Sequence, residues 1–205
     1  MPPRAPRRLA AETTIAWDVD DVLNDLMRAW FDEAFRREHP ETTATYDSLT
    51  HNPPHEVLGI GLGAYLESLD AFRAKRQMTL APDEAVLNWF ARRGDEYRHI
   101  AVTATPLRNA HRSAAWVLQH FGRWIRTVTI LPSARDGEQL PIYDATKVDA
   151  LCRLRDVAVL IDDTPKNMHG IERAGAVGIL VPRPWNGLSG GIDAALAQLD
   201  ARLDA

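Results

Sequence analysis

The stretch from Thr13 to Asp25, TTIAWDVDDVLND, restricts the possible folds of this chain more than any other part of the sequence. It begins as a short apolar run and ends abruptly in acidic residues, as expected for a buried strand that carries carboxylates at its carboxyl end. Open α/β sheets place their chemistry at that edge. Side chains alternate along a strand, so Asp18 and Asp20 should point to the same side. A strand that runs into a solvated acidic turn would give the same pattern, so this stretch needs support from elsewhere.

A second stretch, residues 156–167 with the sequence DVAVLIDDTPKN, repeats the plan. An apolar run that includes Val157, Val159, Leu160 and Ile161 precedes Asp162 and Asp163, and the Thr-Pro pair that follows favours the start of a helix. We expect this helix to end near Gly175. Two strands that each end in paired acids predict one divalent cation site built from both. Because no His or Cys ligands accompany the acids, the hard oxygen donors favour Mg²⁺ over zinc.

The rest of the chain alternates between strand and helix patterns. A strand at 99–103 ends in the hydroxyl of Thr103, and Lys147 begins a helical segment. The helix after Thr103 has one apolar face, as a helix that packs on a sheet should have. Strands separated by helices predict a parallel, doubly wound α/β sheet. Further strands are expected at 125–131 and 177–181, and a last helix at 191–203.

Four motifs in this order resemble those of the haloacid dehalogenase superfamily, whose members are mostly magnesium-dependent phosphohydrolases. The first motif, DxDx(T/V)(L/V), is matched by residues 18–23, DVDDVL; the second, a strand-end Ser or Thr, by Thr103; the third by Lys147; and the fourth by Asp162 and Asp163. The sequence RPWN at 183–186 is similar to the ending found in the 5'(3')-deoxyribonucleotidase branch. Each motif alone is weak, and the ordered set carries the resemblance.

The resemblance implies a Rossmann-like core from residues 11–23 and 98–205, and a small helical cap at 24–97 inserted after the first strand. Such a cap excludes water and selects the leaving group. Trp30 and Arg76 are predicted substrate contacts in the cap, although Trp30 also fits an apolar core position and Arg76 a solvated helix face. Further candidate contacts in the cap are Phe31, Tyr46, His51, His55 and Arg73.

The resemblance also implies a role for each motif residue. Asp18 is the expected nucleophile, which forms an aspartyl-phosphate, and Asp20 the general acid and base. Thr103, with Ala104 beside it, and Lys147 should contact the phosphoryl group. The expected Mg²⁺ ligands are Asp18, the backbone carbonyl of Asp20, Asp162 and Asp163.

Composition narrows the function classes. The net charge of -4 gives no basic surface for a nucleic acid polymer. No apolar run is long enough for a membrane span, and the basic, proline-rich residues 1–10 resemble a disordered tail more than a secretory signal, so a cytoplasmic location is expected. The partner is predicted to be a small phosphorylated metabolite, with a 5'-nucleotide as the favoured candidate. A phosphotransferase or a non-catalytic binding protein on the same scaffold remain alternatives, and the oligomeric state is not indicated.

Overall fold

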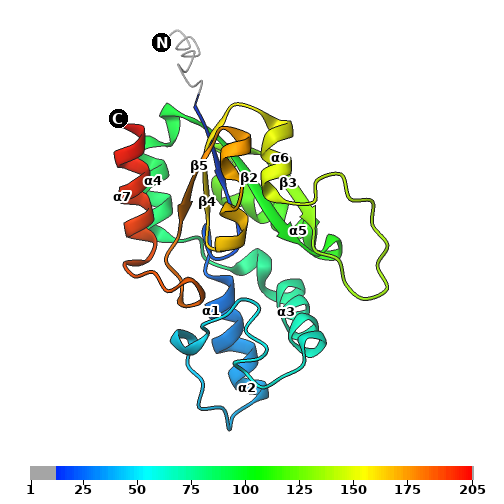
Figure 1. Ribbon diagram of the computed structural model, residues 1–205. Coiled ribbons are helices and arrows are strands. Elements are labelled where there is room, and N and C mark those ends of the chain that lie inside the picture. Colours follow the sequence, from blue (N-terminus) through cyan, green and yellow to red (C-terminus); the bar gives the residue numbers. More distant parts are fainter. Residues whose placement is uncertain (1–12, 205) are drawn as a thin grey trace, which may run out of the picture.

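The computed structural model describes residues 13–204, and its centre is a five-stranded parallel sheet with the strand order β3-β2-β1-β4-β5 (Figure 1). The predicted tail at 1–10 lies outside the described residues. The predicted parallel α/β architecture is confirmed. The strands are β1 (Thr14–Trp17), β2 (Arg98–Thr105), β3 (Ile125–Pro132), β4 (Val157–Asp162) and β5 (Val177–Leu180).

The side of the sheet on which the chain adds its strands changes between β1 and β4. From β1 it proceeds to β2 and β3 on one side, and then returns to place β4 and β5 on the other side. Trp17 pairs with Ile161, so the two acidic stretches continue from neighbouring strands in register. In open α/β sheets ligands bind at the carboxyl ends of the strands where the order reverses. This topology therefore places both acidic stretches at the expected position for a site.

Side chains alternate along the strands and pack into two hydrophobic clusters, one on each face of the sheet. Ile15 and Trp17 pack with α4 (Glu84–Arg93), α5 (Leu107–Phe121) and α7 (Gly191–Leu203) on one face. Ala16 and its neighbours pack with α6 (Lys147–Leu154) on the other. The strands are thus buried on both sides, as is usual for parallel sheets.

The predicted helix after Asp163 is wrong. Two short 3₁₀ turns, Pro165–Met168 and Ile171–Ala174, occupy this segment instead. They are separated by Gly170, whose φ of 76° lies in the left-handed region and interrupts any continuous right-handed helix.

A second unit lies beyond the carboxyl edge of the sheet (Figure 1). It is formed by a continuous helical segment, α1 (Leu26–Trp30), the π-helical residues Phe31–Phe35 and α2 (Arg36–Glu38), and by α3 (Leu62–Arg76). Its aromatic and aliphatic side chains form their own hydrophobic cluster, which Trp185 joins from the core. We call this unit the cap.

The two connections between cap and core run side by side. Asn24 and Pro82 form an antiparallel bridge, and the amide of Asp83 donates to the carbonyl of Leu23 at 2.9 Å. The helix α4 follows this junction and packs with α7 (Figure 1). It lies within the range 24–97 predicted for the cap, but its side chains belong to the same hydrophobic cluster as those of β1.

No helix within residues 13–204 is long and apolar enough to cross a membrane.

Candidate active site

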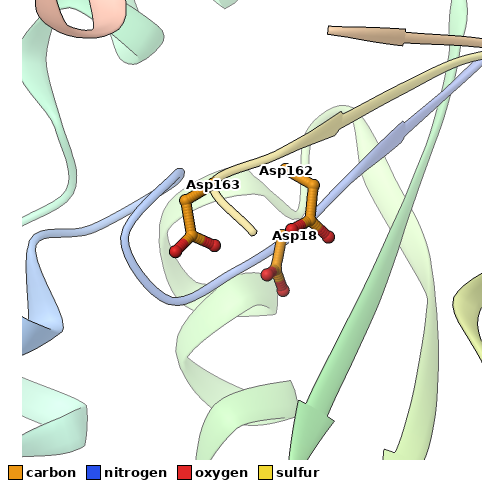
Figure 2. Close-up of side chains that lie close together, drawn as sticks. All are labelled: Asp18, Asp162 and Asp163. Carbon is orange, nitrogen blue, oxygen red and sulfur yellow. The ribbon is translucent and has the colours of Figure 1, made fainter. Parts of the chain in front are cut away.

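Three carboxylates gather where β1 and β4 end (Figure 2). Asp18 directly follows β1, Asp162 is the last residue of β4, and Asp163 follows it. One oxygen from each lies within 4.8 Å of the others, and all three residues are buried. The sequence prediction that the two acidic stretches would meet agrees with this geometry.

Lys147 offsets part of the negative charge of these carboxylates. Its ammonium lies 2.6 Å from Asp18 Oδ2 and 2.6 Å from Asp162 Oδ2, and its side chain is 3% exposed. Burial alone would lower the pKa of Lys147, but the two carboxylates outweigh burial and raise it. Lys147 therefore stays charged at neutral pH. A capping box between Thr146 and Asp149 begins the helix that positions it.

Burial also shifts the pKa values of the carboxylates. It raises the pKa of Asp18 well above its ordinary value, and Lys147 opposes that shift. Burial and the neighbouring Asp162 raise the pKa of Asp163 to about 8. When all three carboxylates are ionised, their negative charge exceeds the positive charge of the single ammonium, and a divalent cation would neutralise the excess.

The residues present fit such a cation. The donors are carboxylate oxygens, which suit Mg²⁺, and they converge from two strand ends. Asp18, Asp162 and Asp163 would hold the ion. The predicted use of the Asp20 backbone carbonyl as a fourth ligand stays a prediction.

The carboxylate of Asp20 lies under the cap and outside this cluster. Arg73 of α3 donates to Asp20 Oδ2 at 2.9 Å, and Gln77 donates to Oδ1 at 3.4 Å. Asp20 Oδ1 also accepts a long contact of 3.5 Å from Asn24. A residue of the first acidic stretch is therefore paired with a cap arginine, a contact that sequence spacing gave no means to predict.

The turn after Asp20 is fixed by the RPWN segment. Asp21 has a φ of 62°, which is unusual for a residue with a side chain. Arg183 donates two hydrogen bonds to its carbonyl, at 2.6 and 2.8 Å. The indole of Trp185 donates to Asp163 Oδ2 at 2.8 Å, and Asn186 donates to the Asp163 carbonyl at 2.9 Å. One segment thus supports both acidic stretches.

A cavity of about 300 Å³ lies between the cap and the carboxyl edge of the sheet. The side chains of Asp18, Asp20, Thr103 and Lys147 line it, together with Ala104. Leu26, Tyr65 and Leu69 contribute apolar walls from the cap. The structure therefore brings most of the predicted core site residues together around one cavity, and Asp162 lies behind its lining, in contact with Lys147.

Two predicted cap contacts lie elsewhere. Trp30 is fully buried in the hydrophobic cluster of the cap, where its indole donates to Ser68. Arg76 faces outward and pairs with Glu33 at 2.9 Å. Neither side chain lines the cavity. Of the other cap candidates, Arg73 lines it, whereas Phe31, Tyr46, His51 and His55 do not.

Some residues at the site were not identified from the sequence. Asn167 donates to both oxygens of Asp162, at 3.0 and 3.1 Å. Arg135, in the segment after β3, forms a bidentate pair with Asp70 of α3 at 2.7 and 2.8 Å. The position of Asn167 shortly after the second acidic pair is a weak signal. The Asp70 pair joins residues 65 apart and has no local signal.

Comparison with known proteins supports the fold. No family model and no curated protein matches the chain. Among solved structures, it is similar to a hydrolase from Streptococcus pneumoniae TIGR4, with 16% identity, a TM-score of 0.59 and coverage of 94% of this chain and 98% of the other.

Two further structures give the same result. A haloacid dehalogenase-like family hydrolase from Streptococcus pneumoniae has 14% identity, a TM-score of 0.55 and coverage of 91% and 90%. A provisionally named phosphoglycolate phosphatase from Lactobacillus delbrueckii subsp. bulgaricus has 12% identity, a TM-score of 0.58 and coverage of 92% and 97%. At such low identity these similarities establish a haloacid dehalogenase-like fold, and function must be argued from the site.

Proposed function

We propose that this protein is a magnesium-dependent phosphomonoester hydrolase that acts through an aspartyl-phosphate on a small phosphorylated metabolite. One observation carries the proposal: a buried carboxylate, Asp18, lies beside an ammonium and two further carboxylates and lines a small cavity. The similar structures described as a hydrolase and as a phosphatase are consistent with it.

In the first step an oxygen of Asp18 attacks phosphorus, and the bond from phosphorus to the leaving oxygen breaks. The leaving oxygen keeps the electron pair and takes a proton from Asp20. In the second step Asp20 removes a proton from water, whose oxygen attacks the phosphorus of the aspartyl-phosphate. Inorganic phosphate leaves, and the Asp18 carboxylate is restored.

The other residues stabilise charge. Lys147 lies against Asp18 and would offset the negative charge of the phosphoryl group as it approaches. Thr103, which is buried two residues before the end of β2, lines the cavity and would donate to a phosphoryl oxygen. Asp18, Asp162 and Asp163 would hold Mg²⁺, which would supply further positive charge to offset that of the phosphoryl group and the carboxylates.

The proposed substrate class is small phosphorylated metabolites, which is broader than the 5'-nucleotides favoured by the resemblance. A cavity of about 300 Å³ suits a small metabolite better than a polymer. A 5'-nucleotide is retained as a candidate because the RPWN sequence at 183–186 is similar to the ending found in the 5'(3')-deoxyribonucleotidase branch. A phosphotransferase would use the same aspartyl-phosphate with an alcohol in place of water.

The test is hydrolysis of p-nitrophenyl phosphate with and without Mg²⁺. We expect Mg²⁺-dependent turnover, its complete loss in Asp18→Asn, and a loss of at least ~10²-fold in Asp20→Asn, the usual scale of general acid and base assistance. Lys75→Ala, on the exposed side of α3, is the control. Turnover that survives in Asp18→Asn would contradict the proposal. A folded wild type that binds phosphate but never turns over would indicate a binding protein.

A further inference from the structure

The strand β3 forms one edge of the sheet, and no other strand of residues 13–204 pairs with its outer side (Figure 1). It is eight residues long, whereas β5 at the opposite edge has four. Within the described part of the chain, the amides and carbonyls of β3 form hydrogen bonds with β2 and with no other segment. Such an edge presents a row of free donors and acceptors with which a strand of another chain can pair.

The sequence of β3 leaves its middle open to this pairing. Edge strands are commonly protected by charged side chains, by proline or by a β-bulge. In β3 these features lie at the ends, with Arg126 and the register shift against β2 before Val128, and Pro132 as the last residue. The residues between, TVTIL at 127–131, are uncharged and mostly β-branched, which favours an extended strand.

Apolar side chains are exposed beside this strand. Ile142 and Tyr143 are 72% and 89% exposed, the two highest values among the large apolar side chains that the structure describes. A cavity of about 350 Å³ at the end of β3 is lined in part by Tyr143 and by three residues of the strand, Ile130, Leu131 and Pro132. Exposed apolar groups that gather at one place mark an interaction surface.

Two exposed charges flank β3 at opposite ends. Arg126 lies near its start, and its guanidinium donates to the Arg123 carbonyl at 3.0 Å. Asp136 follows shortly after its last residue, Pro132. Neither Arg126 nor Asp136 forms an ion pair with any of residues 13–204. The edge therefore has a free positive charge at one end and a free negative charge at the other.

We propose that β3 is the interface of a homodimer, in which a second copy of this chain adds its own β3 antiparallel to the first. The two sheets then become one continuous sheet. A two-fold axis through the middle of the strand brings Arg126 of one protomer toward Asp136 of its partner, and the same contact is repeated at the other end. Each exposed pair Ile142 and Tyr143 is covered by the partner's edge.

The charges favour a second copy as the occupant of this edge. In a two-fold interface the same surface meets itself, so it must be self-complementary. Antiparallel pairing of β3 with itself places opposite charges together at both ends, whereas parallel pairing would place like charges together. Opposite charges across an interface fix the register and suppress wrong partners.

Sedimentation velocity at protein concentrations from ~1 to ~100 μM measures the dissociation constant of the dimer. We expect a concentration-dependent dimer of the wild type. Arg126→Glu should raise the dissociation constant by at least ~10-fold, because it places two acids together at both ends of the interface. Adding Asp136→Arg to this variant restores opposite charges, and the dissociation constant should return to within ~3-fold of the wild type. Arg202→Glu, at an exposed position of α7, makes the same charge change and should leave the dissociation constant unchanged.

Amide hydrogen exchange locates the interface within the chain. Pairing of the outer edge protects amides of β3, so peptides from β3 should exchange at least ~10-fold more slowly at ~100 μM than at ~1 μM protein. Peptides from β5, at the opposite edge, should exchange at the same rate at both concentrations.

A wild type that remains monomeric over this concentration range overturns the proposal. A dimer that tolerates Arg126→Glu, or whose β3 exchanges at the same rate at both concentrations, uses another surface and also overturns it. If Arg126→Glu does not fold, the exchange of β3 in the wild type decides.

Discussion

The ammonium of Lys147 balances buried carboxylates that would otherwise repel one another. It contacts both Asp18 and Asp162 at 2.6 Å, and Asp162 is 0% exposed. Replacing it by an apolar side chain of similar length leaves those charges uncompensated. We predict that Lys147→Met lowers the free energy of unfolding by about 3 to 5 kcal/mol without added cation.

Mg²⁺ should restore part of this loss, because it supplies the missing positive charge at the same carboxylates. Urea unfolding at pH 7 with and without Mg²⁺ measures both effects. A loss of stability that Mg²⁺ does not reduce would mean that the cation does not bind at Asp18, Asp162 and Asp163. Lys75→Met on the exposed side of α3 serves as the comparison.

Single residues of the site were predictable where a strand end fixes them. Asp18 follows β1, Asp162 ends β4 and Thr103 lies two residues before the end of β2, which continues past the predicted end at 103 to Thr105; the parallel sheet brings these strand ends together. The pairing of Asp20 with Arg73 was not predictable, because it depends on how the cap folds back over the sheet. Local patterns carry no information about such contacts.

The 3₁₀ turn Pro184–Asn186 acts on the metal ligands through Trp185. Its indole donates to Asp163 Oδ2 at 2.8 Å and so orients a carboxylate of the cluster. Trp185→Phe keeps the aromatic packing and removes this hydrogen bond. We predict that its affinity for Mg²⁺ falls by about 10- to 100-fold, as is usual when a group that orients a ligand is lost.

The measurement is the Mg²⁺ concentration that gives half-maximal activity, supported by calorimetric titration. Trp124→Phe is a matched control, since its indole donates to Asp95 at an exposed position. Equal effects of the two substitutions on Mg²⁺ affinity would contradict the role given to Trp185.

The strands β1 and β2 are joined by a buried histidine. His99 accepts a hydrogen bond from the Trp17 indole at Nδ1, and its Nε2 donates to the Gly94 carbonyl at 3.0 Å. Burial lowers the pKa of His99 to about 4. Below about pH 6.5 His99 is protonated in the unfolded chain but stays neutral in the folded chain until about pH 4. The free energy of unfolding therefore decreases as the pH falls from 6.5 toward 4.

At pH 5 this effect should cost about 2 kcal/mol relative to pH 7. In His99→Gln, which keeps a donor for Gly94, that part of the pH dependence should disappear. Urea unfolding of both proteins at pH 7 and pH 5 gives the comparison. If the two proteins lost the same stability between these pH values, His99 would not be the group responsible.

Regular elements were predictable to the extent that one face of each is buried against the sheet. The apolar spacing of α5 and α7 gave helices at the observed places. The helix predicted after Asp163 does not form, because Gly170 takes a left-handed conformation between two short turns. The helix α4 lies within the range 24–97 predicted for the cap, and its packing with α7 depends on tertiary contacts that local patterns do not specify.

At the level of the whole molecule, the cap and the core have separate hydrophobic clusters. Trp185 is the core residue that joins the cluster of the cap. Buried ion pairs from Asp20 and Arg135 connect the core to α3. Units that share few apolar contacts can open independently of global unfolding. The ion pairs are therefore expected to control how often the cap opens over the cavity.

Arg135 offers a way to measure this opening. It is anchored in the core by hydrogen bonds to Ser133 and holds Asp70 with two more. In Arg135→Ala the buried carboxylate of Asp70 loses its bidentate partner, which favours states in which α3 lifts into water. We predict faster amide hydrogen exchange in α3, by about 10-fold or more, with little change in α6. Mass spectrometry of peptides from the two helices tests this, with Arg123→Ala as the control, because Arg123 pairs with the exposed Asp95 and lies outside both helices. Equal acceleration in α3 and α6 would show that Arg135 stabilises the whole fold and does not act on the cap.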